Sequence, residues 1–184
     1  MKGTYTVTAN NTMASEAPGP INDDQCQRWQ HSLKIVLEDP KGYAHFYWFL
    51  QKHEEKNRLR KGEYCRYLDF WKECEDYKKH TTKTVPELKT LANDIYEKYL
   101  SSSADNKIAL DGDERIVFKL REFLDDIEED NEEEKTVLLN AFDDAVEGMR
   151  KFVERGGCRN AYNEWTEGLK SDEKKKSKFR CRLM

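Results

Sequence analysis

The sequence lacks the patterns that would define a metal centre, a disulfide framework or a membrane span. Its five cysteines include no Cys-x-x-Cys pair, and its four histidines show no metal-ligand spacing. No run of about 18 apolar residues occurs. Residues 1–5 begin neither an apolar signal core nor a myristoylation pattern. We therefore expect an intracellular protein with free thiols that binds no metal or cofactor.

Apolar residues are also scarce, and the charge is unevenly distributed. Hydrophobic and charged residues each make up 37% of the 184 residues, and the mean hydropathy is -1.00. Residues 168–184 carry seven Lys/Arg against two Asp/Glu, a net charge of +5, whereas residues 21–167 carry a net charge of -9. An acidic body excludes nucleic-acid binding by the core.

The chain divides into three parts by composition. Residues 1–20 mix small polar residues without periodicity and predict a disordered segment, residues 21–167 form one domain, and residues 168–184 form a basic tail. Within the domain, apolar residues at three- and four-residue spacing predict helices over 22–38, 43–50, 63–79, 86–100, 113–124 and 137–153, with a short last helix at 161–165. The fold class is therefore all-α, with seven to nine helices.

The core is expected to close around the helix that contains Phe70 and Trp71. These two adjacent aromatic side chains supply a large buriable area. The charged run 51–62 is predicted to be a helix end followed by an exposed loop. The acidic run 125–134 lacks the calcium-loop spacing, so a solvated connection is favoured over a calcium site.

The order of these helices resembles the regulator of G-protein signalling (RGS) homology family. The matching residues arrive in family order across about residues 22–167: Trp29-x3-Leu33-x3-Leu37, Gly42-x3-Phe46-x2-Phe49-Leu50, Leu68-Asp-Phe-Trp71, Cys74-Glu-x-Tyr77, Ala92-x2-Ile95-Tyr96-x2-Tyr99, Leu110-Asp111 and Phe142-Asp-x-Ala145. The resemblance implies about nine helices, arranged as an antiparallel four-helix bundle and a subdomain that pairs the two ends of the chain.

The resemblance also implies a function and a partner. RGS domains bind the switch regions of a GTP-bound Gα subunit and hold them in their transition-state arrangement, while the chemistry remains that of the GTPase. The positions in this chain that correspond to the Gα-binding surface are Glu63, Tyr64, Arg66, Tyr67, Ala109, Asp111, Gly156, Arg159 and Asn160.

Several of these positions depart from the family pattern. Active members carry an asparagine where this chain has Tyr67, a second asparagine where it has Ala109, and an aspartate and an arginine near Gly156 and Asn160. A phenol differs from a short amide in reach, volume and hydrogen bonding, so these changes argue against the ordinary activating role. The run 51–62 borders the same edge and either blocks or reshapes it.

Three functions are weighed on this basis. The first is binding and regulation of Gα, with altered GTPase activation. The second is a non-catalytic scaffold at the membrane that uses the helical bundle, for example through its acidic face at 125–134. The third is an enzyme with its own active site, which the sequence supports poorly because it contains no Ser/His/Asp grouping and no Gly-rich phosphate loop.

The tail carries a candidate lipidation motif. Cys181 is the fourth residue from the end of the sequence, Leu183 is aliphatic, and a final Met184 favours a farnesyl group. Neighbouring Lys and Arg residues would add attraction to the anionic inner leaflet. We favour prenylation over a merely solubilising tail, which predicts a cytoplasmic protein held peripherally at the inner face of the plasma membrane.

Overall fold

Helices account for all the regular secondary structure that is described. The computed structural model describes residues 17–111, 113–127 and 131–180, and within them there are nine α-helices and no strand. The helices are α1 Asp23–Trp29, α2 Leu33–Glu38, α3 Pro40–Asn57, α4 Cys65–Tyr77, α5 Val85–Tyr99, α6 Asp113–Asp126, α7 Glu132–Leu139, α8 Asp143–Arg155 and α9 Arg159–Arg180. The all-α class is confirmed.

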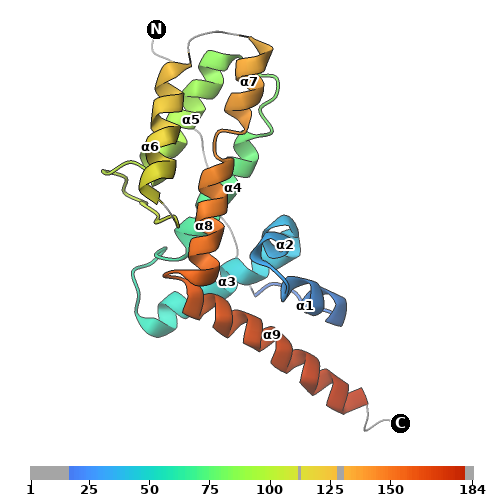
Figure 1. Cartoon of the computed structure of the whole chain (residues 1–184). Helices are drawn as coiled ribbons and strands as arrows, with labels where there is room; N and C mark the ends of the chain where they lie inside the picture. The colour runs from blue at the N-terminus through green and yellow to red at the C-terminus, as the bar shows by residue number, and fades with distance from the viewer. Residues whose placement is uncertain (1–16, 112, 128–130, 181–184) are drawn as a thin grey trace.

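The helices form two groups that share α8 and the start of α4 (Figure 1). In the first group, α5 packs against α4, α6 and α7, and α8 packs against α4 and α6. In the second group, α1, α3 and α8 all contact α9, so the first and the last described helices lie together. This is the expected bundle with a subdomain that pairs the chain ends.

Helix α4 joins the two groups through its two adjacent aromatic residues. Phe70 is fully buried and meets Tyr99 and Phe142 edge to face, with ring centroids 5.5 and 6.3 Å away. Trp71 points to the other side and lies 5.5 Å from Tyr43 of α3. Because neighbouring helical residues project about 100° apart, Phe70 packs within the first group of helices and Trp71 packs against the second.

The terminal subdomain is built around Trp29. Its ring is fully buried and stacks on Trp165 of α9 at 6.4 Å, while its indole N–H donates to the Asp39 carboxylate at 3.0 Å. Gly42 allows this packing, since a Cβ there would lie 2.7 Å from the carbonyl oxygen of Val36 and 2.9 Å from the indole ring.

Several predicted helix boundaries are wrong. The helix expected over 22–38 divides at residues 30–32, where the Ser32 side chain accepts the N–H of Ile35 and starts α2. The helix expected over 137–153 divides at residues 140–142, where the chain turns so that Phe142 enters the core. Both divisions leave the apolar spacing intact, which is why the spacing did not reveal them.

Two helices are longer than expected. Helix α3 continues through the charged run to Asn57 and ends at Arg58, whose backbone is left-handed with φ 55°. Helix α9 begins at Arg159 and continues to Arg180, across the predicted boundary between domain and tail. No described helix has the length and apolar character needed to cross a membrane. Residues 1–16 and Cys181 lie outside the described residues.

Candidate functional site

The predicted surface residues come from three segments far apart in the sequence. Glu63, Tyr64, Arg66 and Tyr67 lie at the start of α4, Ala109 and Asp111 lie in the α5–α6 loop, and Gly156, Arg159 and Asn160 lie at the turn from α8 to α9. Contacts between these segments, rather than sequence proximity, determine whether they form one surface.

A buried carboxylate shapes the first segment. Glu54, on α3, is only 4% exposed and accepts the backbone N–H groups of Gly62, Tyr64 and Cys65 at 2.8, 2.6 and 3.0 Å. These are donors of the loop and of the first turn of α4, a helix whose N-cap residue, Tyr64, forms no capping hydrogen bond with its side chain. Glu54 therefore replaces a local cap and fixes where α4 begins.

Tyr67 brings the three segments together. Its side chain is 4% exposed, and its ring stacks on Phe152 of α8 with centroids 5.3 Å apart and planes 11° apart. Its hydroxyl oxygen accepts the backbone N–H of Ala109 at 3.3 Å. Burial raises the pKa of this phenol, and the Ala109 N–H opposes the rise in part. Tyr67 is thus a neutral, packed residue that links α4 to the α5–α6 loop and to α8.

The α5–α6 loop is also tied to α8 by its backbone. The N–H of Asp111 donates to the carbonyl oxygen of Gly148 at 3.1 Å. A Cβ on Gly148 would lie 3.0 Å from the Ile116 side chain and 3.3 Å from the Leu110 side chain, so the loop and the start of α6 approach α8 more closely than an added Cβ allows without adjustment. The Asp111 side chain remains exposed and available to a partner.

The turn between α8 and α9 completes the edge. Gly156 and Gly157 wrap around the Phe152 side chain, and a Cβ on either would lie under 3.0 Å from it or from its carbonyl oxygen. Cys158 is buried, which raises the pKa of its thiol to about 12, while the charge of Arg66 opposes that rise. Arg159 and Asn160, at the start of α9, are exposed.

Arg66 and the neighbouring loop give this edge a positive character. The guanidinium of Arg66 lies 5.7 Å from the centre of the Tyr67 ring, and its buried Nε has no hydrogen-bond partner among the described atoms. Arg58, Arg60 and Lys61, in the adjacent loop, are largely exposed and form no ion pair with a described side chain. The phenols and thiols nearby are neutral, so the surface offers shape, hydrogen bonds and positive charge.

Three residues that organise this edge were missed from the sequence: Glu54, Gly148 and Phe152. A signal existed for Glu54, because it continues the spacing of Tyr47 and Leu50 along the buried face of α3. Its position in a charged run concealed that signal. For Phe152 and Gly148 the contacts depend on how α8 packs, which no local pattern reports.

Comparison with known proteins identifies the family. The family model described as the Regulator of G protein signaling domain matches residues 32–155. Regulator of G-protein signaling 10 from Homo sapiens is 36% identical over 96 residues, and regulator of G-protein signaling 8 from Danio rerio is 29% identical over 92 residues. Each match covers about half of this chain and 46% of the relative. This chain therefore belongs to the regulator of G-protein signalling family.

Proposed function

We propose that this chain binds a GTP-bound Gα subunit through the edge formed by the start of α4, the α5–α6 loop and the α8–α9 turn. Family membership supports the class of partner. The contacts of Tyr67 with Ala109 and Phe152 support the use of these three segments as one surface. Exposed Asp111, Arg159 and Asn160 supply polar groups at its rim.

We further propose that binding occurs without the ordinary acceleration of GTP hydrolysis. The observation that carries this proposal is the packing of Tyr67, whose ring lies on Phe152 and whose hydroxyl is already bonded to Ala109. The family pattern places an amide here to hold the switch glutamine of the GTPase. Loss of one such interfacial hydrogen bond costs about 1–3 kcal/mol, equivalent to about 5- to 150-fold in rate.

The test separates binding from activation. The full chain is presented to a panel of Gα subunits loaded with GDP, with GDP and aluminium fluoride, or with a non-hydrolysable GTP analogue, and affinity is measured by interferometry. Single-turnover GTP hydrolysis is measured on the same panel. We expect binding to an activated form with little acceleration. Strong acceleration of GTP hydrolysis contradicts the second proposal alone. If the chain binds none of the Gα forms, both proposals are contradicted.

We also propose that the basic tail holds the protein at the inner face of the plasma membrane through lipidation of Cys181. The spacing of Cys181 from the end of the sequence and the neighbouring lysines support this assignment. Fractionation of cells that express the tagged chain compares the parent with Cys181→Ser. The variant is expected in the soluble fraction, and an unchanged membrane fraction contradicts the proposal.

A further inference from the structure

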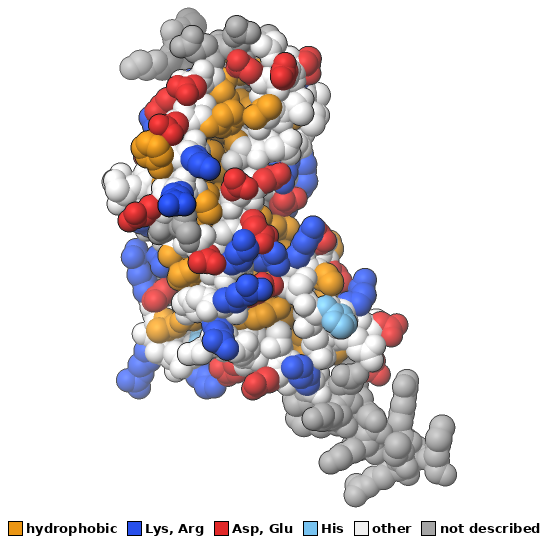
Figure 2. All heavy atoms as spheres, viewed as in Figure 1, with side chains coloured by type: hydrophobic (Ala, Val, Ile, Leu, Met, Phe, Trp, Pro, Cys, Tyr) orange, Lys and Arg blue, Asp and Glu red, His pale blue; other side chains and the backbone are white. Residues whose placement is uncertain are grey.

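An apolar groove lies between α6 and α7 and is lined by residues other than those of the edge described above. Both helices pack on α5, and the space between them has a volume of about 510 Å³. Figure 2 shows hydrophobic side chains gathered at this place, with acidic groups around its upper end and both basic and acidic groups below. The lining residues are Arg115, Ile116, Lys119, Leu120 and Phe123 of α6, Thr136 and Val137 of α7, Asn140, Ala141 and Asp144.

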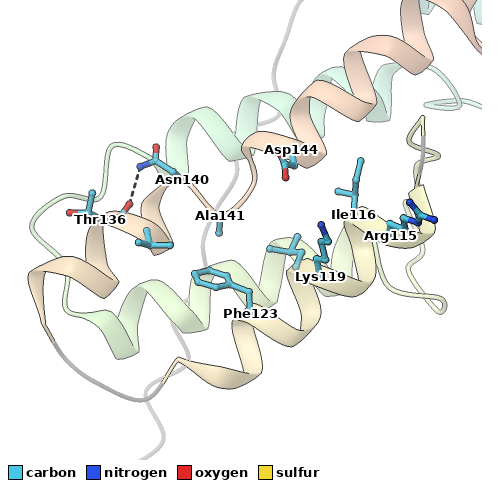
Figure 3. A pocket seen from close by; sticks show the side chains of 10 residues that line it. Arg115, Ile116, Lys119, Phe123, Thr136, Asn140, Ala141 and Asp144 are labelled. Carbon is cyan, nitrogen blue, oxygen red and sulfur yellow. Dashed lines mark hydrogen bonds between the residues drawn. The ribbon is translucent and has the colours of Figure 1, made fainter.

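The groove wall formed by α7 is already shaped for an apolar partner. The Asn140 side chain donates to the carbonyl oxygen of Thr136 at 2.9 Å (Figure 3), and the Thr136 hydroxyl donates to the carbonyl oxygen of Glu132 at 2.8 Å. These polar groups are satisfied by their own segment. Val137 is 50% exposed, an unusual fraction for a large apolar residue facing a groove with an apolar floor.

The two ends of the groove carry opposite charge. Arg115 and Lys119, one helical turn apart on α6, are exposed and form no ion pair with a described side chain, and they outnumber Asp144 on the opposite wall. At the other end, Asp126 lies one turn beyond Phe123, and Glu133 lies one turn before Val137. Both carboxylates are exposed.

From this geometry we propose that the groove binds an amphipathic helix of a partner protein. Its apolar residues, at i, i+4 and i+7, cover Val137, Ala141 and Phe123. Its N-terminal half is acidic and lies against Arg115 and Lys119, and its C-terminal half is basic and lies toward Asp126 and Glu133. Acidic N-terminal and basic C-terminal turns are also what the helix dipole favours, so one helix satisfies both conditions.

The proposal fixes a direction for the bound helix, parallel to α6 and antiparallel to α7. It also fixes a length, because the stretch of α6 from Arg115 to Asp126 rises about 16 Å, or about three turns. The proposal does not rest on Gα binding, since none of the groove-lining residues belongs to the edge around Tyr67.

Two synthetic helices of about three turns and identical composition provide the probe. Both carry leucine at i, i+4 and i+7 and are stapled on the outward face, so that helicity is the same. One has glutamates first and lysines last, and the other has the reverse order. Fluorescence anisotropy with the full chain measures affinity, and we expect the acid-first peptide to bind about five- to tenfold more tightly at low salt.

Variants of the protein test the site. Val137→Glu is expected to weaken the acid-first peptide at least tenfold, whereas Phe118→Glu, at a 62% exposed position outside the groove, is expected to leave binding unchanged. Lys119→Glu is expected to narrow or reverse the preference between the two peptides. A spin label at the peptide N-terminus is expected to broaden amide signals near Arg115 rather than near Asp126.

Other results overturn the proposal. Absence of binding by both peptides, equal affinity for both, or indifference to Val137→Glu each contradicts it. Self-association of the chain that Val137→Glu abolishes in sedimentation experiments would mean that a second copy, not a partner helix, covers the groove. Substitution of Arg159 on the Gα-facing edge is expected to leave peptide binding unchanged, so failure here and failure of Gα binding are separate outcomes.

Discussion

The hydroxyl of Tyr67 lies 3.3 Å from the backbone nitrogen of Ala109 and accepts its N–H. The two positions at which the family resemblance leads us to expect asparagine are therefore bonded to each other in this chain. The tyrosine also stacks on Phe152, so the substitution is supported by packing on one side and by a hydrogen bond on the other. One contact thus connects the family pattern, the stability of the edge and the proposed loss of activation.

Restoring both asparagines should increase activation and decrease stability. Tyr67→Asn combined with Ala109→Asn returns the amides of the family pattern, and we expect faster single-turnover GTP hydrolysis by the Gα subunits that the parent binds. Removal of the buried ring should cost about 3 kcal/mol in the free energy of unfolding.

Tyr67→Phe is the matched control. It retains the stack on Phe152 and removes only the hydroxyl, so urea unfolding should show a loss of about 1 kcal/mol. It should not raise the rate of GTP hydrolysis. A double-asparagine variant that folds and still fails to accelerate any Gα would show that Tyr67 and Ala109 do not account for the proposed loss of activation.

Glu54→Gln should loosen the loop that precedes α4. An amide accepts hydrogen bonds less strongly than a carboxylate and brings two donors into a site that already holds three N–H groups. We expect a loss of about 2–3 kcal/mol in unfolding free energy. The amides of Gly62, Tyr64 and Cys65 should exchange hydrogen faster.

The adjacent residue supplies the control for this prediction. Glu55 is exposed and pairs with Lys52 at 2.8 Å on the surface of α3. Glu55→Gln removes the same charge from the next position, and it should change the unfolding free energy by no more than about 0.5 kcal/mol. Equal effects of the two substitutions would show that net charge, rather than the buried contacts, is responsible.

Asp69 gives the chain a measurable dependence on pH. Burial raises the pKa of its carboxyl from 3.8 to about 6, although the Tyr47 hydroxyl and Lys98 oppose the rise. The folded chain therefore holds this proton more tightly than the unfolded chain. The stability that the proton contributes is complete below pH 3.8 and is lost as the pH rises through about 6.

Asp69→Asn has no proton to lose, so its unfolding free energy relative to the parent should rise between pH 4 and 7. We expect a rise of about 1–2 kcal/mol after allowance for solvent screening. Asp76→Asn is the control of opposite sign, because hydrogen bonds from Lys79 and Lys72 lower the pKa of Asp76 despite its partial burial. As the pH rises through the acidic range, the unfolding free energy of Asp76→Asn relative to the parent should fall instead.

Gly42→Ala should destabilise the terminal subdomain. A methyl group there would meet the Val36 carbonyl oxygen at 2.7 Å and the Trp29 ring at 2.9 Å, and neither is free to move. We expect a loss of about 1–3 kcal/mol and a lower melting temperature. Gly168→Ala, in α9 where an added Cβ would meet no atom within 4 Å, should instead raise stability by about 0.5–1 kcal/mol.

The sequence was sufficient for the fold class and for most buried faces, because helical spacing reports which residues share a side. It was insufficient where a helix divides without interrupting that spacing. Leu33 follows Trp29 by four residues and Phe142 follows Leu138 by four, so each pair reads as one continuous face. The divisions depend on the Ser32 cap and on where Phe142 packs, and these effects are respectively short-range and tertiary.

The contacts within the candidate site also could not be predicted from the sequence. The family resemblance proposed the three segments and the departures at Tyr67 and Ala109 from the sequence. That these two residues touch, and that Phe152 lies beneath the ring, required the structure. Glu54 reads as a solvated charge in a charged run, and only its enclosure by α4 shows that it is buried.

Because α9 is one continuous helix, its length and its rotation about its own axis affect the position of the domain separately. A helix of 22 residues spans about 33 Å, and each added residue turns its far end by about 100°. Under the proposed anchoring, one residue inserted after Leu169 would rotate the domain about the helix axis with almost no change in reach. Seven inserted residues would add about 10 Å and restore the original facing to within about 20°. The rotational phase of α9 would then set which side of the domain faces the membrane.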